Sequence, residues 1–247
     1  MANALAVILA AGQGTRMNSD LPKVLFPACE KPMIHHVVSA LNAAGVQRCV
    51  VVVGYRADLV KDSLDAFSGI EFAVQAERLG TGHAVMMCRN QIESHEGPVL
   101  VVAGDSPMIQ STSIEKLLQR FETEKPACIL GTLLKDDPTG LGRIVRDSSG
   151  AFDSIVEQRD ATDEQLSISE VNMSTYVFDA RGLSLALSEL KPENQQQEYY
   201  LTDCPSILKE HGRLVIADPI LQSCEALSVN TPEELAIVES AMRRMGY

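Results

Sequence analysis

Short apolar runs alternate with helical patterns over the first half of the chain, and this alternation constrains the fold more than any other feature. Each run is rich in valine, isoleucine and leucine and lacks polar alternation, which is typical of strands covered on both faces. The predicted strands are residues 4–10, 48–53, 71–74, 99–103 and 127–134. Because a helical pattern separates successive strands, the sequence predicts an α/β fold with a Rossmann-like, three-layer and mostly parallel sheet.

Apolar residues spaced three and four apart predict the helices between these strands. The expected helices are residues 32–44, 57–67, 81–91 and 113–124. Thr112 and Glu115 form a capping-box pattern that predicts the start of the last of these. A final helix, 232–245, is predicted from Thr231, from Glu234 three residues later, and from proline at its first turn.

The pattern changes after about residue 135, where loop-like sequence surrounds shorter apolar runs. Here the sequence predicts hairpin strands at 143–145 and 151–157, a strand at 173–178 and a helix at 182–190. We expect 1–247 to be a single domain. Its expected parts are a first half of about 1–135, a smaller β-rich lobe within about 136–230, and a C-terminal helix at 231–247.

The composition of the chain indicates which binding partners and which cellular compartment to expect. The net charge of −12, from 33 acidic and 21 basic residues, argues against a nucleic-acid partner and against an anionic membrane surface. No apolar run is long enough to span a bilayer, and none has the pattern of a secretion signal. The six cysteines contain no Cys-x-x-Cys pair and are typical of small core residues in a reducing cytoplasm.

A glycine-rich turn, Leu9-Ala-Ala-Gly12-Gln-Gly14-Thr-Arg16, directly follows the first predicted strand, and Lys23 lies shortly beyond it. A turn of this kind exposes backbone N–H groups to a phosphate. The Gly-Lys-Ser/Thr of a P-loop is absent, and so is a complete Gly-x-Gly-x-x-Gly. The two cations favour a nucleoside triphosphate as ligand, and the alternative is an ordinary glycine turn with two solvated cations.

Asp105 follows the predicted strand 99–103, at the edge of the sheet where α/β proteins bind ligands. Its carboxylate is a hard oxygen ligand that suits Mg²⁺, although a turn-capping role before Pro107 explains it equally well. Thr231 already supplies the cap of the last helix, so we expect the amide oxygen of Asn230 to be free as a second ligand. The alternative for Asn230 is an ordinary loop residue.

Together these motifs resemble the sugar-1-phosphate nucleotidyltransferase family, over nearly the whole chain. The resemblance is strongest to the uridyltransferase domains of the bacterial bifunctional N-acetylglucosamine-1-phosphate enzymes. The blocks 75–84, 160–165 and 198–203 are more specific than the glycine-rich loop, which is general to the superfamily. All matching blocks are residues 9–17, 20–25, 75–84, 104–105, 136–144, 155–165, 170–172, 198–203 and 229–230.

The resemblance implies an enzyme that transfers UMP from UTP to N-acetylglucosamine 1-phosphate and releases pyrophosphate. It implies that Arg16 and Lys23 are the catalytic cations and that Asp105 and Asn230 bind Mg²⁺. The implied nucleotide contacts are Leu9, Ala10, Ala11, Gly12, Gly14, Gln75, Gly80 and Thr81. The implied sugar contacts are Gly104, Gly142, Glu157, Asn172, Tyr200 and Thr202. UTP and the sugar 1-phosphate are the expected partners, and a homo-oligomer is compatible with the sequence.

The chain departs from the family pattern at three places. Ala103 stands where an aromatic residue is usual, Met173-Ser174 replaces Thr-Gly, and Ser228 replaces glycine. The first two lie near the implied sugar pocket, so transfer to another sugar 1-phosphate remains an alternative. A non-catalytic nucleotide-sugar-binding protein is the second alternative, and the presence of Arg16, Lys23, Asp105 and Asn230 together argues against it.

Overall fold

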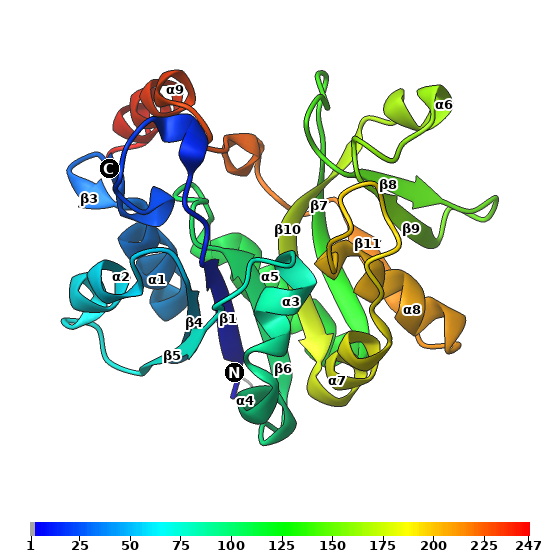
Figure 1. Cartoon of the computed structure of the whole chain (residues 1–247). Helices are drawn as coiled ribbons and strands as arrows, with labels where there is room; N and C mark the ends of the chain where they lie inside the picture. The colour runs from blue at the N-terminus through cyan, green and yellow to red at the C-terminus, as the bar shows by residue number, and fades with distance from the viewer. Residues whose placement is uncertain (1–2) are drawn as a thin grey trace.

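The computed structural model describes residues 3–247, in which helices cover both faces of a central sheet (Figure 1). The strands on the main path of this sheet are β1 (Leu5–Ala10), β4 (Arg48–Val53), β5 (Ile70–Val74), β6 (Pro98–Ala103), β7 (Cys128–Leu134), β10 (Glu170–Asp179) and β11 (Val215–Asp218). Their spatial order is β11-β7-β10-β6-β1-β4-β5. Every neighbouring pair is parallel except those made by β10, so the predicted mostly parallel, three-layer sheet is confirmed.

The reversed direction of β10 follows from the connection before it. Parallel strands need a crossover, usually a helix, whereas an antiparallel strand can return through a hairpin-rich segment. Between β7 and β10 the chain forms only the hairpin β8 (Arg143–Arg146) and β9 (Phe152–Val156) and the one-turn helix α6 (Asp163–Leu166). The hairpin predicted at this place is confirmed, and it joins the sheet through a pairing of Arg143 with Val171 of β10.

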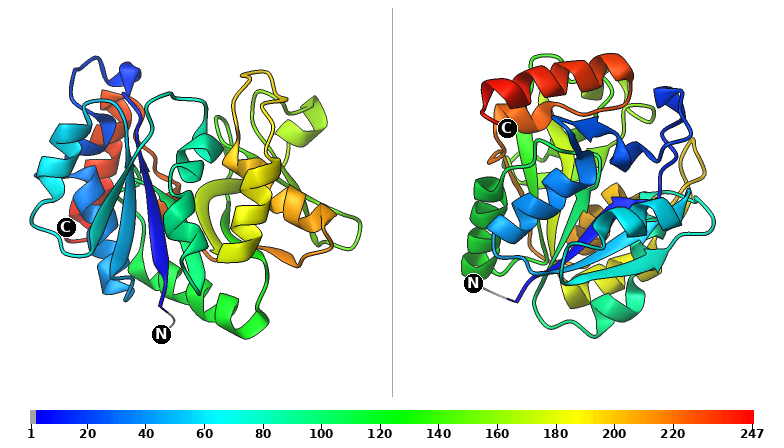
Figure 2. Two further views of the ribbon diagram at one scale, coloured as in Figure 1. Left: turned by 60° about the horizontal axis from the view of Figure 1, so that its bottom comes forward. Right: turned by 90° about the vertical axis from the view of Figure 1, so that its left-hand side faces the viewer.

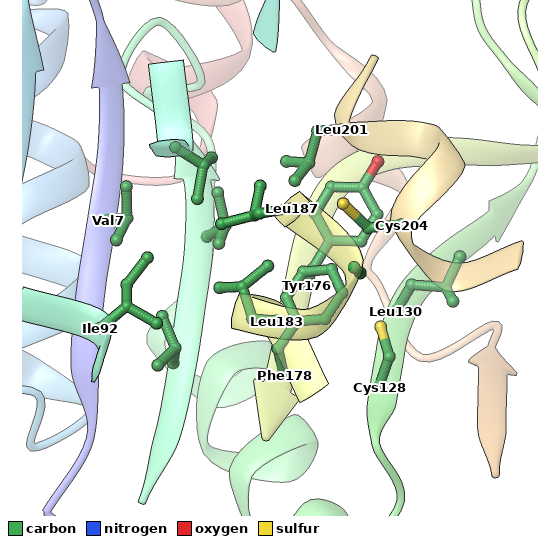
Figure 3. Close-up of a cluster of buried hydrophobic side chains, with 14 of the residues drawn as sticks. Val7, Ile92, Cys128, Leu130, Tyr176, Phe178, Leu183, Leu187, Leu201 and Cys204 are labelled. Carbon is green, nitrogen blue, oxygen red and sulfur yellow. The ribbon is translucent and has the colours of Figure 1, made fainter. Parts of the chain in front are cut away.

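Two hydrophobic clusters fill the layers on either side of the sheet. Val7 belongs to one cluster and Ile8 to the other, because successive side chains of a strand point to opposite faces. The Val7 face is covered by α3 (Thr81–Met86), α4 (Arg89–Glu93), α7 (Ala180–Glu189) and α8 (Cys204–Glu210), as Figures 2 and 3 show. The Ile8 face is covered by α1 (Met33–Ala43), α2 (Ala57–Leu64) and α5 (Ser111–Glu124).

A third cluster fixes the C-terminal helix α9 (Pro232–Arg244) on the segment that follows β1 (Figure 1). Val238 and Met242 of α9 pack with Met17, Met33 and Met108, all of them buried. The segment from β1 to α1 also contains the short helices η1 (Thr15–Met17) and η2 (Lys23–Leu25) and the strands β2 (Pro27–Ala28) and β3 (Lys31–Pro32). This packing brings the start of α9 to the glycine-rich loop.

Several local predictions are wrong. The helix expected at 81–91 is divided into α3 and α4, with Met87 and Cys88 between them. The capping box at Thr112 is absent, because α5 already begins at Ser111 and its N-cap makes no side-chain hydrogen bond. Helix α8 and strand β11 were not predicted, and neither were the short helices η3 (Leu201–Asp203) and η4 (Ser223–Ala226).

A buried carboxylate stabilises the start of α5 in place of the predicted box. The carboxylate of Glu225 accepts hydrogen bonds from the Gln110 backbone N–H at 3.0 Å and from the Ser113 hydroxyl at 2.6 Å. At α9 the prediction is partly confirmed, since Thr231 accepts from the Glu234 N–H as expected. The Glu234 carboxylate, however, accepts from the Asn230 N–H and does not close the box.

Two further observations bear on the environment of the chain. All six cysteines are free thiols. No helix among residues 3–247 has both the length and the apolar character needed to cross a bilayer.

Candidate active site

A pocket of about 310 Å³ opens where β1 and β6 end, at the carboxyl edge of these parallel strands. Nine residues predicted from the sequence line it: Leu9, Ala10, Ala11, Gly12, Lys23, Gln75, Gly80, Thr81 and Asp105. Residues that the sequence analysis did not assign also line it, namely Val24, Arg78, Ala84, Ala103, Ser174 and Glu198. The pocket therefore joins the glycine-rich loop to the block at 75–84, as the resemblance implied.

The glycine-rich loop is shaped around Lys23. Gly14 has a φ of 70°, a left-handed conformation that glycine adopts without strain. A Cβ atom at this position would lie 2.6 Å from the Cβ atom of Lys23. Glycine is therefore required here both by the backbone conformation and by the close approach of the lysine stem.

Lys23 is the centre of the polar contacts in the pocket. Its Nζ atom lies 2.5 Å from Oδ2 of Asp105 and donates to Oδ1 of Asn230 at 2.8 Å. The Arg16 guanidinium donates to the same Asn230 oxygen at 2.8 Å. The four predicted polar residues thus meet at one point, although they come from three separate parts of the sequence.

The expectation that the Asn230 oxygen is free is wrong, because two cations donate to it. Its role as a magnesium ligand stays a prediction. The donor set fits that role, since a carboxylate and an amide oxygen converge on one positive charge, the ammonium of Lys23. Mg²⁺ in such sites takes one or two protein oxygens and completes its shell with substrate phosphates and water.

Gln75 is buried at the other side of the pocket and is held in one orientation. Its Nε2 atom donates to the carbonyl oxygen of Gly80 at 3.1 Å and lies 3.1 Å from Nδ1 of His83. Because a carbonyl oxygen can only accept, this contact identifies Nε2 as the end turned toward Gly80. Oε1 makes no hydrogen bond with any residue from 3 to 247, which leaves an acceptor available to a ligand.

Two sequence blocks more than a hundred residues apart form the wall next to Gln75. The Gly82 N–H donates to the Tyr199 carbonyl at 2.8 Å, and the Leu201 N–H donates to the Thr81 hydroxyl at 3.1 Å. Gly80 has a φ of 110°, and a Cβ atom there would lie 2.5 Å from the Tyr199 oxygen. Two of the more specific blocks of the resemblance, 75–84 and 198–203, are therefore one structural unit.

The predicted sugar residues lie mainly in the lobe next to this pocket. Gly142, Glu157 and Asn172 are adjacent: a Cβ atom on Gly142 would lie 3.6 Å from atoms of both other side chains. The Asn172 amide donates to the buried Tyr176 hydroxyl at 2.7 Å. Tyr200 is also buried, and its hydroxyl accepts from Gln196 at 2.5 Å. Gly104 differs from these residues, because the close approach of the Leu9 carbonyl oxygen and Val24 already explains why glycine stands there.

Carboxylates gather beside these residues. Burial raises the pKa of Glu157 above its ordinary value. Burial, together with the charges of Glu157 and Asp160, also raises the pKa of Asp203 to about 6. Asp203 was not among the predicted site residues. Its position at the end of the 198–203 block was the only sequence signal that could have indicated it.

An α/β fold with a glycine-rich loop, a cation pair and an acidic residue at the carboxyl edge of its sheet defines a nucleotide-binding protein. A family model described as nucleotidyl transferase matches residues 5–218. The chain belongs to this family of nucleotidyltransferase enzymes. The family resemblance inferred from the sequence is thus confirmed.

Similar curated proteins include the bifunctional protein GlmU of Bacillus cereus and that of Geobacillus thermodenitrificans. Each is 44% identical to this chain over 243 residues, which cover 98% of the chain and 52% of the relative. GlmU of an Exiguobacterium strain is 44% identical over 239 residues, or 97% of the chain and 52% of the relative. The chain therefore spans about half the length of these relatives.

Solved structures share the fold at much lower sequence identity. A UDP-glucose pyrophosphorylase in complex with UDP-glucose superimposes with a TM-score of 0.80 at 18% identity, covering 98% of both chains. A putative glucose-1-phosphate thymidylyltransferase from Bacillus anthracis gives a TM-score of 0.81 at 20% identity, covering 99% of this chain and 97% of the other. These likenesses confirm the fold.

Proposed function

We propose that this enzyme transfers UMP from UTP to N-acetylglucosamine 1-phosphate and forms UDP-N-acetylglucosamine and pyrophosphate. The main support for this proposal is a set of four polar side chains that lie together beside the pocket containing Gln75. They are Arg16, Lys23, Asp105 and Asn230. A triphosphate bound along the glycine-rich loop would place its charge on the two cations, with its base toward Gln75. The similarity to GlmU over 98% of the chain supports the same reaction.

In the proposed reaction a phosphate oxygen of the sugar 1-phosphate attacks the α-phosphorus of UTP. A new P–O bond forms, the bond from the α-phosphorus to the oxygen bridging to the β-phosphorus breaks, and pyrophosphate leaves. A phosphate monoester is already anionic near neutral pH, so the nucleophile needs no general base. Arg16 and Lys23 offset the negative charge that develops on the reacting phosphates.

Asp105 and Asn230 would hold Mg²⁺, which supplies further positive charge to phosphate oxygens when it is bound. Lys23 can then change partners. Without substrate its ammonium lies against these two oxygens, and with substrate its long stem allows it to reach a phosphate. The partners that we propose are therefore UTP, a sugar 1-phosphate and Mg²⁺.

For the sugar, the supporting observations are the adjacency of Gly142, Glu157 and Asn172 and the burial of Tyr200 and Thr202. We assign the first three to the sugar hydroxyls and phosphate, and the last two to the pocket for the N-acetyl group. A different sugar 1-phosphate is the second candidate. Its motivation is that the short side chains of Ala103 and Ser174 line the pocket. We also propose a reducing, cytoplasmic environment, which the six free thiols favour.

Pyrophosphate release, measured with and without Mg²⁺ over a panel of nucleotides and sugar phosphates, tests the proposal. The expected result is turnover that requires Mg²⁺ and is fastest with UTP and N-acetylglucosamine 1-phosphate. Faster turnover with glucose 1-phosphate would contradict the sugar assignment alone. Binding of UTP without pyrophosphate release from any pair would instead indicate a non-catalytic nucleotide-sugar-binding protein.

A further inference from the structure

A second pocket, of about 520 Å³, lies at the opposite edge of the sheet from the nucleotide pocket. β10 runs antiparallel to β6, so that Asp179 at the end of β10 pairs with Pro98 at the start of β6. The start of β11 likewise pairs with the start of β7. The pocket thus lies where β7 and β11 start and the antiparallel β10 ends, whereas the candidate active site lies where β1 and β6 end.

Three chain corners build this second pocket, and backbone hydrogen bonds join them. The corners connect α5 to β7, β10 to α7, and α8 to β11. The Ala127 N–H donates to the Leu214 carbonyl at 2.8 Å, and the Asp179 N–H donates to the Ala127 carbonyl at 2.9 Å. These hydrogen bonds hold the backbones of the three corners in place relative to one another.

Each corner contributes one cation to the pocket: Lys125, Arg181 and Arg213. Among residues 3–247, none forms a hydrogen bond or an ion pair with any of these three head groups, although the chain carries a net charge of −12. Asp179 is the single carboxylate in the lining, and its Oδ2 atom is already occupied by the Gly182 N–H at 2.8 Å. The lining therefore carries three cations and one carboxylate, and no described residue pairs with the three cationic head groups.

The lining also contains apolar surface. Phe121, Pro126, Ala127 and Leu214 contribute to it, and Leu214 is 53% exposed. The volume of the pocket lies within the range of small-molecule sites. Three separated cations match a ligand with several negative charges, and the apolar surface can accommodate an uncharged portion of the same molecule.

We propose that this second pocket binds a small molecule carrying two or more phosphate groups. Arginine forms paired hydrogen bonds with phosphate oxygens, and a diphosphate or triphosphate presents enough charge to contact all three cations at once. Inorganic oligophosphate and a nucleotide share this chemistry. They differ in whether a base is present to contact Phe121 and Leu214.

Isothermal titration calorimetry with inorganic tripolyphosphate, ADP and citrate tests this proposal. The test variant is the double substitution Arg181→Ala and Arg213→Ala, and the matched control is Arg243→Ala and Arg244→Ala on α9. Both variants remove two exposed cations and therefore change the net charge equally. Neither variant changes a residue that lines the candidate active site, so binding there should be the same in both. Thermal unfolding of both variants checks that the fold is retained.

We expect the test variant to bind tripolyphosphate about tenfold more weakly than the wild type and the control do, because two exposed charge pairs are lost. A further substitution, Lys125→Ala, should weaken binding again. The difference between the wild type and the test variant separates this pocket from the candidate active site. A larger loss of affinity for ADP than for tripolyphosphate would identify a nucleotide as the ligand, and the reverse would identify an oligophosphate. Equal affinity in all three proteins, or citrate binding as tightly as tripolyphosphate, would overturn the proposal. No arm requires turnover, so the result is independent of the proposed activity.

Discussion

Replacement of Gln75 by leucine should remove the discrimination between UTP and CTP. Nε2 of Gln75 is held by the Gly80 carbonyl oxygen at 3.1 Å, which leaves Oε1 as an acceptor in the pocket. Uracil presents an N–H group on its base-pairing edge, where cytosine presents a lone pair. In the wild type, UTP therefore satisfies Oε1, whereas CTP places two acceptors against each other.

The magnitude follows from the burial of Gln75, which is only 4% exposed. An unsatisfied buried polar group costs about 1–3 kcal/mol, which corresponds to roughly tenfold to over a hundredfold in kcat/KM. Gln75→Leu has nearly the same volume but no acceptor. We expect kcat/KM for UTP to fall by about this factor, kcat/KM for CTP to change little, and the ratio of the two to approach one.

Competition between UTP and CTP in a pyrophosphate-release assay, with N-acetylglucosamine 1-phosphate as acceptor, measures this ratio directly. Gln119→Leu is the matched control, because Gln119 is exposed on α5 and far from the pocket in sequence. Thermal unfolding shows whether the loss of the Gly80 contact affects the fold as a whole. A Gln75→Leu enzyme that is folded and keeps the wild-type preference for UTP would refute the reasoning.

Three further predictions test the polar groups. Asp105→Ala should lower Mg²⁺-dependent turnover by about a hundredfold or more without unfolding the chain, whereas near-wild-type rates at saturating Mg²⁺ would contradict the ligand assignment. Arg16→Ala should lower kcat by roughly a hundredfold with a smaller rise in KM for UTP, and a change in KM alone would make Arg16 a ground-state binder. The raised pKa of Asp203, about 6, means that the folded state retains a proton that the unfolded state releases, so stability falls as the pH rises from about 4 to about 6. Asp203→Asn should therefore raise the urea midpoint more at about pH 7.5 than at about pH 4.5, and an equal effect at both values would show that Asp203 does not titrate in this range.

Local sequence patterns were sufficient for the five early strands, of which four are almost fully buried and β5 is only partly buried. The strand 48–53 coincides with β4, and the other four early strands are predicted to within one residue at each end. The reason is that a strand covered on both faces needs a continuous apolar run, which is visible in sequence. The capping pattern at Thr112 failed because such a pattern describes only local hydrogen bonds. It carries no information about Glu225, which binds the start of α5 from more than a hundred residues away.

The sequence by itself determined the layered fold, the glycine-rich loop, and the residue types needed to bind a nucleotide. Each of these depends on neighbouring residues, on the period of a strand or helix, or on the chemistry of one side chain. Only the tertiary structure decided which groups meet. It placed Asn230 against Arg16 and Lys23 through the packing of α9, and it joined the block at 75–84 to the block at 198–203. It also placed three cations from separate corners of the chain around one pocket. Contacts of this kind form because apolar faces that are distant in the sequence pack against each other. A local sequence pattern shows that a face is buried but does not show which other element covers it.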